Sequence, residues 1–272
     1  FNLNYGHHDG VERSMFPMQY KPRFGNLVNN TAQRMECETL YWKDKTITLT
    51  NRNYDEVFGK ELDDINKYDP VDHKDAYARE HMLEYAHKTI DQTRKVVKEL
   101  CGKNKITSER YVMNKPKQLL HDIIGRIDYE TNKLFIELKT KPPSIVKKKG
   151  KDEYYFKTQP LGDDAVFDAY WGQVAFYWKC TGKKPFLVLV NDKEYLIYDD
   201  THAALYDDHL EYQYNMMVKR IYNWEQMIIY CKGDLQKLAD ISEPPDLNHY
   251  YHYKYLTDKQ RKTIKKLWGL DA

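Results

Sequence analysis

The stretch that decides the fold is "GRIDYETNKLFIELKT", residues 125–140. An apolar segment ends at Asp128, and the turn-forming letters "YETNK" follow directly. Residues 134–139 then alternate, so three apolar side chains share one face of a strand while Glu137 and Lys139 share the other. A carboxylate and an ammonium are costly to bury unless they are paired or take part in chemistry. The strand therefore carries a candidate active site.

The overall composition favours a globular protein with a substantial core. The chain has 272 residues, of which 41% are hydrophobic and 31% charged, enough for one large domain or for a domain with extensions. Because the net charge is only +2, any contact with nucleic acid has to depend on local clusters of charge. There is no run of about 18 apolar residues, so we expect no membrane-spanning segment.

The four cysteines predict free thiols. Cys37, Cys101, Cys180 and Cys231 are widely spread and form no Cys-x-x-Cys pair, a pattern that favours neither a zinc site nor a disulfide framework. Free thiols are typical of a reducing compartment. We expect the cytoplasm, which would be the host cytoplasm if a phage encodes the protein; the mitochondrial matrix and the nucleus stay open.

Hydrophobic periodicity predicts a mixed α/β core. Apolar spacings of three and four predict a helix from a cap at Asp72 to a stop at Gly102, one over 164–180, and a long one between Thr201 and Gly233. Short apolar runs predict strands at 45–51, 109–113, 119–128, 133–140, 185–190 and 194–199. From residue 72 the order is helix, three strands, helix, strand. The expected domains are an N-terminal extension over 1–72, a core over 73–240 and a basic tail over 241–272.

Asp128 and Glu137 suggest a metal site. Pairing of their two strands would bring the carboxylates together, and carboxylate oxygens are the ligands that Mg²⁺ or Mn²⁺ prefers. Lys139, on the same face as Glu137, could polarise an attacking water or neutralise charge that develops on a phosphate. These are the parts that hydrolysis of a phosphodiester needs.

This arrangement resembles the PD-(D/E)XK nuclease superfamily, whose signature reads Asp128 … Glu137-Leu138-Lys139 here. The resemblance implies a restriction-endonuclease-like core of the order α-β-β-β-α-β, with a mixed central sheet flanked by helices. It also implies that the backbone carbonyl of Leu138 is a further metal ligand beside Asp128 and Glu137.

A second motif resembles the RecB-type branch of that superfamily. In "YWGQVAFYW", residues 170–178, Gln173 and Tyr177 are four residues apart and share a helix face. The resemblance implies that both are catalytic residues that help to position DNA or water. Residues 125–177 are particularly similar to the mitochondrial genome maintenance exonuclease family and its phage relatives, through Gly125, Asp128, Glu137, Lys139, Thr140, Phe167, Asp168, Gln173 and Tyr177 in order.

RecB-type nucleases often add a metal-binding His in a pattern like Gly-x-x-x-His-x-x-x-Glu on the first core helix. The segment "YAREHMLEYA", residues 77–86, offers His81 and Glu84, although Tyr77 stands where the Gly would be. The rival segment "RFGNLVNN" offers Gly25, with Asn29 in place of His. Both stay open, and Glu80, Glu84 and Glu109 are further candidate carboxylates.

The residues that follow the strand with Glu137 and Lys139 are the expected contact with nucleic acid. Six lysines and no acid lie between 139 and 151, and Pro142-Pro143 ends the strand. A flexible loop there would hang over the site and meet phosphates, and unpaired bases could stack on the tyrosines that follow. The residues expected to bind are Lys141, Lys147, Lys148, Lys149, Lys151, Tyr154 and Tyr155. The basic segment 254–268 is either a helix docked on the core or a contact with DNA or a partner.

Our main expectation is that the protein is a Mg²⁺-dependent DNA exonuclease or flap nuclease that acts on single-stranded ends. One alternative is a structure-specific or restriction-type endonuclease of the same superfamily, and another is a nucleic-acid-binding module whose nuclease core is inert. Some relatives hold an iron–sulfur cluster with one upstream and three downstream cysteines. Because only Cys180 and Cys231 follow Tyr177, we expect no such cluster.

Overall fold

The computed structural model describes residues 20–42, 45–50, 53–66, 70, 73–150, 153–163, 166, 168–243 and 258–270. They form two compact units. The larger contains the described residues between Met18 and Asn114 together with Asp122–Asn215, and the smaller contains Lys115–His121 and the described residues from Met216 onward. None of the described helices combines the length and apolar character needed to cross a membrane.

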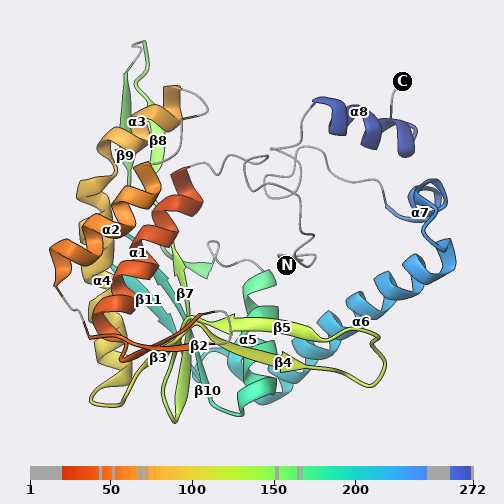
Figure 1. Cartoon of the computed structure of the whole chain (residues 1–272), viewed down its shortest axis with the longest axis horizontal. Helices are drawn as coiled ribbons and strands as arrows, with labels where there is room; N and C mark the ends of the chain where they lie inside the picture. The colour runs from red at the N-terminus through yellow and green to blue at the C-terminus, as the bar shows by residue number, and fades with distance from the viewer. Residues whose placement is uncertain are drawn as a thin grey trace. The chain divides into compact units, whose positions relative to one another are not determined.

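A seven-stranded mixed sheet forms the centre of the larger unit (Figure 1). The strand order is β11-β10-β7-β6-β3-β1-β2. Neighbouring strands are antiparallel except for the parallel pairs β7–β10 and β1–β3. The strands are β1 (Thr39–Trp42), β2 (Lys45–Thr48), β3 (Thr107–Ser108), β6 (Tyr129–Glu130), β7 (Leu134–Thr140), β10 (Lys184–Val190) and β11 (Tyr195–Tyr198).

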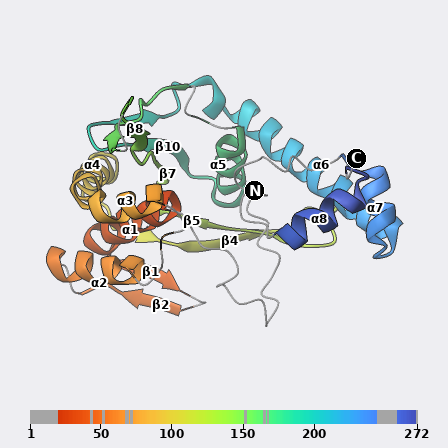
Figure 2. The ribbon, with the colours of Figure 1, turned by 90° about the horizontal axis from the view of Figure 1, so that it is seen from above.

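Helices cover both faces of this sheet (Figures 1 and 2). On one side lie α1 (Tyr20–Glu36), α2 (Tyr54–Asn66), α3 (His73–His81) and α4 (Leu83–Cys101), where α1 packs along α4. On the other side α5 (Asp168–Thr181) packs against β10. After the 3₁₀ turn Ala203–Leu205, the helix α6 (Asp207–Cys231) follows. The general α/β prediction, a mixed central sheet flanked by helices, is confirmed.

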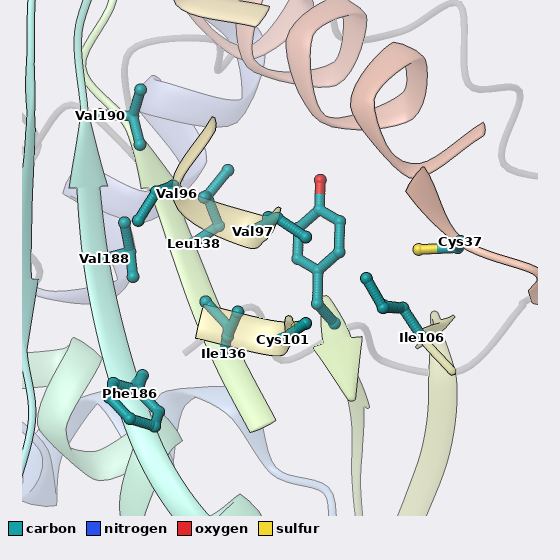
Figure 3. Packing of buried hydrophobic residues seen from close by; sticks show 11 residues of the cluster. Cys37, Val96, Val97, Cys101, Ile106, Ile136, Leu138, Phe186, Val188 and Val190 are labelled. Atoms are coloured by element: carbon teal, nitrogen blue, oxygen red, sulfur yellow. The ribbon is translucent and has the colours of Figure 1, made fainter. Parts of the chain in front are cut away.

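The alternation predicted for β7 sorts its side chains between the two helical layers. Ile136 and Leu138 join a buried cluster with α4 and β10 (Figure 3), formed by Cys37, Val96, Val97, Cys101, Ile106, Tyr129, Ile136, Leu138, Phe186, Val188 and Val190. On the opposite face, Phe135 meets Tyr177 of α5 edge to face. Each fully buried aliphatic side chain contributes about 1.5–3 kcal/mol through the hydrophobic effect. This packing fixes which face of β7 carries Glu137 and Lys139.

Two helices begin or end at other residues than the sequence predicted. The helix expected from residue 72 is interrupted at Met82, whose fully buried side chain packs with Phe24 of α1 and Ile90 of α4. Its end at Gly102 is as predicted, since Gly102 adopts a positive φ. The helix α5 begins at Asp168 instead of 164, and the Asp163 carboxylate accepts a hydrogen bond from Tyr198. The proposed cap Asp72 lies outside the described residues.

The described part of the segment 1–72, which we expected to be an N-terminal extension, packs with the predicted core. Helix α1 buries Phe24, Leu27 and Val28 against α3 and α4, so residues 20–66 belong to the larger unit. The helix gave a weak periodic signal because several of its inward-facing residues are polar. The C-terminal part of the smaller unit begins at Met216, before the expected boundary near residue 240.

Two of the three predicted core strands have a break at one end. The strand predicted over 109–113 is β4 (Arg110–Asn114), which Glu109 separates from the short β3. The strand predicted over 119–128 is β5 (Ile123–Ile127), which Asp128 separates from the short β6. Strands β4 and β5 pair as a separate two-stranded ribbon. The backbone of Glu109 has φ 57°, a conformation that side-chain-bearing residues adopt rarely, in turns and at functional sites.

The Lys-rich segment is not the flexible loop that we expected. It forms a hairpin of β8 (Ser144–Lys147) and β9 (Tyr154–Lys157). The pair Ile145 and Phe156 is directly opposed in this hairpin, and both side chains pack into the cluster around Met82 and Ala86. In the smaller unit, the basic segment forms α8 (Asp258–Leu267) beside α7 (Leu235–Ile241).

Candidate active site

The breaks in the two strands place acidic side chains beside β7. Asp128 lies between β5 and β6, and Glu109 lies between β3 and β4 at the same level of the strand pairing, between the pairs Arg110↔Ile127 and Thr107↔Glu130. Glu137 projects from the next strand of the sheet. Backbone geometry thus gathers three carboxylate-bearing residues that are far apart in the sequence.

The Asp128 carboxylate is fixed by the backbone of β7. Its Oδ2 accepts a hydrogen bond from the N–H of Leu138, with 2.9 Å between the two atoms. Leu138 lies beyond the last β6–β7 pair, Tyr129↔Ile136, so no β6 residue uses its polar groups. The N–H and C=O of one residue in a strand face the same side. The carbonyl of Leu138 therefore faces the side on which Asp128 lies, as the resemblance implies for a ligand.

Glu137 is buried in an ion pair. Its side chain is only 1% exposed, and its Oε1 pairs with the ammonium of Lys139. Among the described residues, no group donates a hydrogen bond to the other oxygen, Oε2. A buried carboxylate oxygen without a donor is costly. Oε2 of Glu137 is therefore a candidate metal ligand.

The pKa values of these groups follow from burial and from one another. Burial, followed by the charge of Glu137, raises the pKa of Asp128 well above its usual range. Burial also raises the pKa of Glu137, although Lys139 acts in the opposite sense. For Lys139, burial disfavours the ammonium, but the carboxylates of Glu137 and Asp128 outweigh burial and raise the pKa. The lysine therefore remains a cation.

A chain of hydrogen bonds leads from Lys139 into α5. The ammonium donates to Gln173 Oε1 at 2.9 Å, and Gln173 Nε2 donates to the hydroxyl of Tyr177 at 2.9 Å. Tyr177 in turn donates to the carbonyl of Arg126 at 2.6 Å. Gln173 and Tyr177 share a helix face towards β7, as predicted. Tyr177 is buried, so any effect of its hydroxyl on DNA or water would pass through Gln173; its expected catalytic role stays a prediction.

Gly125 permits this close packing of α5 on β5. A Cβ atom at this position would lie 2.4 Å from Cε1 of Tyr177 and 2.9 Å from Cε1 of Phe176. Such separations are far below van der Waals contact, so only glycine fits without displacement of both rings. The glycine in the Gly-x-x-Asp pattern thus positions Tyr177.

Helix α1 contributes two polar side chains to the site. Nδ2 of Asn29 lies 3.5 Å from Oδ1 of Asp128, and Tyr129 donates to Oδ1 of Asn29 at 2.9 Å. One turn later, Gln33 donates to Oε1 of Glu109 at 2.9 Å and to the carbonyl of Asp128 at 3.3 Å. Sequence reasoning found Asn29 only as the rival of His81, and it missed Gln33.

The approach of α1 to β7 again depends on a glycine. A Cβ atom on Gly25 would lie 3.0 Å from the hydroxyl oxygen of Thr140, the last residue of β7. Asn29 follows Gly25 by four residues and lies on the same side of the helix. The spacing Gly25-x-x-x-Asn29 was the available signal, and the structure favours this segment over the one that contains His81.

His81 does not join the site. Its side chain is exposed on α3, 3.7 Å from Glu80, and its ring packs against Tyr77. None of its described contacts involves Asp128 or Glu137. Glu84 is exposed and pairs with Lys88 one turn further along α4. Of the further candidate carboxylates, only Glu109 lies at the site.

The expected nucleic-acid contacts divide into buried and exposed groups. Lys141 is buried with its ammonium over the ring of Tyr170, where Lys139 also lies, and burial lowers the pKa of Lys141. Lys148 pairs with Glu153 at 2.7 Å.

The remaining expected contacts lie on the hairpin. Lys147, Lys149 and Tyr155 are exposed, whereas Tyr154 packs beside Tyr77 and is less available for stacking than expected. Lys151, and the side chains of Phe167 and Asp168, lie outside the described residues.

The donor set fits a hard divalent cation. No group of three His, Cys, Asp or Glu side chains that could hold a metal occurs among the described residues. Mg²⁺, however, needs only one or two carboxylates and keeps several waters. Oxygen ligands for such an ion could come from the carboxylates of Asp128 and Glu137 and from the backbone carbonyl of Leu138.

The chain was compared with family models, with curated proteins and with solved structures, and none of them matches it.

Proposed function

We propose that this chain is a Mg²⁺- or Mn²⁺-dependent nuclease with a PD-(D/E)XK core, which hydrolyses DNA from single-stranded ends. The observation that carries the proposal is the meeting of Asp128, Glu137 and Lys139 at one point, with an unpartnered, buried carboxylate oxygen on Glu137. The chain order α4, β3/β4, β5/β6, β7, α5, β10 also agrees with the core that the sequence resemblance implies.

Asp128, Glu137 and the carbonyl of Leu138 would hold the cation. When bound, it would draw charge from the scissile phosphate and lower the pKa of an adjacent water. The hydrogen bond from Leu138 to Asp128 holds one carboxylate in position, and the ion pair with Lys139 holds the other. Such positioned groups need little reorganisation when the reaction occurs.

Lys139 would stabilise charge and would not act as a base. Its raised pKa keeps the side chain protonated, and an ammonium can only donate hydrogen bonds. Water attacks phosphorus, one P–O ester bond breaks, and negative charge grows on the phosphate oxygens, where a fixed cation is most useful. Gln173 keeps the ammonium directed at this point.

The preference for single strands rests on the surroundings of β7. The β8–β9 hairpin, which follows β7 in the chain, presents Lys147, Lys149 and Tyr155 to solvent. Lysines attract phosphates, and an exposed ring can stack only on a base that is unpaired.

End-labelled DNA substrates test this proposal. With Mg²⁺, linear single strands should be degraded, while a covalently closed circular duplex should survive. Equal cutting of both would favour the endonuclease alternative. Binding of single strands without any cleavage, in Mg²⁺ or Mn²⁺, would favour the inert binding module.

A further inference from the structure

The β4–β5 ribbon exposes an apolar and aromatic face. Tyr111 is 46% exposed, Met113 64% and Ile124 61%. Tyr111 is directly opposite Arg126 in the ribbon, and Met113 is directly opposite Ile124, so all four side chains share one face. The other face carries Gly125, against which α5 packs. An outward strand face is usually polar, so this one requires an explanation.

The exposed face leads directly to the acidic site. The guanidinium of Arg126 lies over the ring of Tyr111, 5.7 Å from its centroid, and its Nη1 lies 3.2 Å from Oε2 of Glu109. The residue after the ribbon strand β5 is Asp128. Arg126, Tyr111, Met113 and Ile124, here called the ribbon platform, thus form a path of side chains that begins at Glu109.

We propose that the ribbon platform binds an unpaired DNA strand and guides it to the site. This inference rests on the proposed nuclease function and assigns its substrate-binding surface. Tyr111 would stack on a base, and Met113 and Ile124 would contact the apolar faces of further bases, which are accessible only in a single strand. Arg126 has five N–H donors, so it can bind a phosphate in addition to Glu109.

A protein partner fits this surface less well. A stable protein–protein interface buries about 800 Å² on each partner and takes about 20–30 residues from each. The ribbon platform offers four side chains on a face two strands wide. A single strand needs only a narrow row of stacking groups with a cation beside them, which is the composition of this face.

Fluorescence anisotropy with a short labelled oligo-dT strand, measured in EDTA so that no cleavage occurs, tests the proposal. Replacement of Tyr111 by Ala should weaken binding by about 5- to 150-fold, the range typical of the removal of one stacking ring. Tyr111→Phe retains the ring and should bind as the wild type does. Tyr212→Ala removes an even more exposed tyrosine from α6 and should leave binding unchanged.

Photo-cross-linking of the unaltered protein gives a readout that does not depend on the folding of a variant. A single strand that contains 5-iododeoxyuridine should cross-link to Tyr111. The proposal is overturned if the wild type does not bind the strand, if Tyr111→Ala binds normally and the cross-link lies elsewhere, or if Tyr212→Ala weakens binding equally. Sedimentation that shows Met113→Gln dissociating a dimer would assign the face to self-association instead.

The two proposals fail separately. If the wild type cleaves DNA but Tyr111→Ala binds and cleaves normally, the nuclease function stands and the platform does not. If the strand binds at Tyr111 and is not cleaved in any divalent metal, the platform stands and the nuclease function does not.

Discussion

The carboxylate of Asp128 accepts a hydrogen bond from the backbone N–H of Leu138, with 2.9 Å between Oδ2 and the nitrogen. This bond connects the break between β5 and β6 to the middle of β7, one residue from Glu137. Because the donor is a backbone group, any acceptor of the same shape at position 128 can keep the geometry. Charge and geometry at this position can therefore be tested separately.

The raised pKa of Asp128 predicts a fold that is destabilised at neutral pH. The native carboxyl holds its proton to a higher pH than in the unfolded chain, where the pKa is about 3.9. Between these two values the native state binds more protons, so stability falls as the pH rises through this window. Asp128→Asn should therefore unfold at a higher temperature than the wild type at pH 7, with the gain lost below about pH 4.

Thermal unfolding between pH 3.5 and 8 measures this difference, and each 1 kcal/mol should shift Tm by about 2–4 °C. Asp91→Asn, which neutralises an exposed carboxylate on α4, is the matched control. Mg²⁺ should raise the Tm of the wild type more than that of Asp128→Asn, since only binding to the native state stabilises it. A Tm for Asp128→Asn below that of the wild type at pH 7 would refute this account of the charge.

Tyr177→Phe should slow catalysis without weakening substrate binding. The change removes the acceptor for Gln173 Nε2 and the donor to the Arg126 carbonyl, so Lys139 is less well oriented. Loss of a residue that orients a group of the site in this way typically lowers activity by about 10- to 100-fold. We expect kcat to fall by about that factor with little change in KM, and stability to fall by about 1–3 kcal/mol.

Tyr198→Phe on β11 is the control for Tyr177→Phe. It also removes a tyrosine hydroxyl that donates a hydrogen bond, in this case to Asp163. It should lower Tm but leave kcat unchanged. Equal effects of the two substitutions on kcat would mean that Tyr177 contributes only to stability.

Gly125→Ala should destabilise the fold and displace Tyr177. The new methyl group would overlap two rings, and overpacking of a well-packed core costs about 1–3 kcal/mol. Gly59→Ala, on α2, meets no atom within 4 Å and should instead stabilise the helix by about 0.5–1 kcal/mol. Chemical denaturation of the two variants compares them directly, and equal stability would show that α5 does not pack on β5 this closely.

The exposed lysines of the β8–β9 hairpin should affect binding but not metal dependence. Lys147→Gln with Lys149→Gln should lower the slope of log K against log salt for single strands by about 0.7 for each phosphate that the variant no longer neutralises. Any residual cleavage should retain its Mg²⁺ dependence. Lys103→Gln, in the turn after α4, is the control, and an unchanged slope for the double variant would remove the hairpin from the binding surface.

Periodicity alone predicted the regular parts of the fold. The apolar face of α4, the alternation of β7 and the fully buried run of β10 are local patterns, and the structure confirms them. The strands predicted at 185–190 and 194–199 are confirmed as β10 and β11, which pair antiparallel. In each case side chains at regular spacings face one environment, which the sequence records directly.

The irregular parts were not predictable in this way. The positive φ of Glu109 and the break at Asp128 depend on tertiary hydrogen bonds such as that from Gln33 to Glu109. Helix α1 was missed because Asn29 and Gln33 face inward, so its polar residues did not mark a solvent face. The hairpin was missed because apolar positions alternate among lysines, which resembles a solvated loop.

Cleavage of an end-labelled linear single strand in Mg²⁺ by the wild type, Glu137→Gln and Lys139→Ala tests the central claim most directly. The wild type should degrade the strand and EDTA should stop it. Each variant should be at least about 100-fold slower, the effect expected when a group that stabilises developing charge is removed. Lys139→Ala should still bind the strand. Turnover by Glu137→Gln close to that of the wild type would contradict the assignment of this site as the catalytic centre.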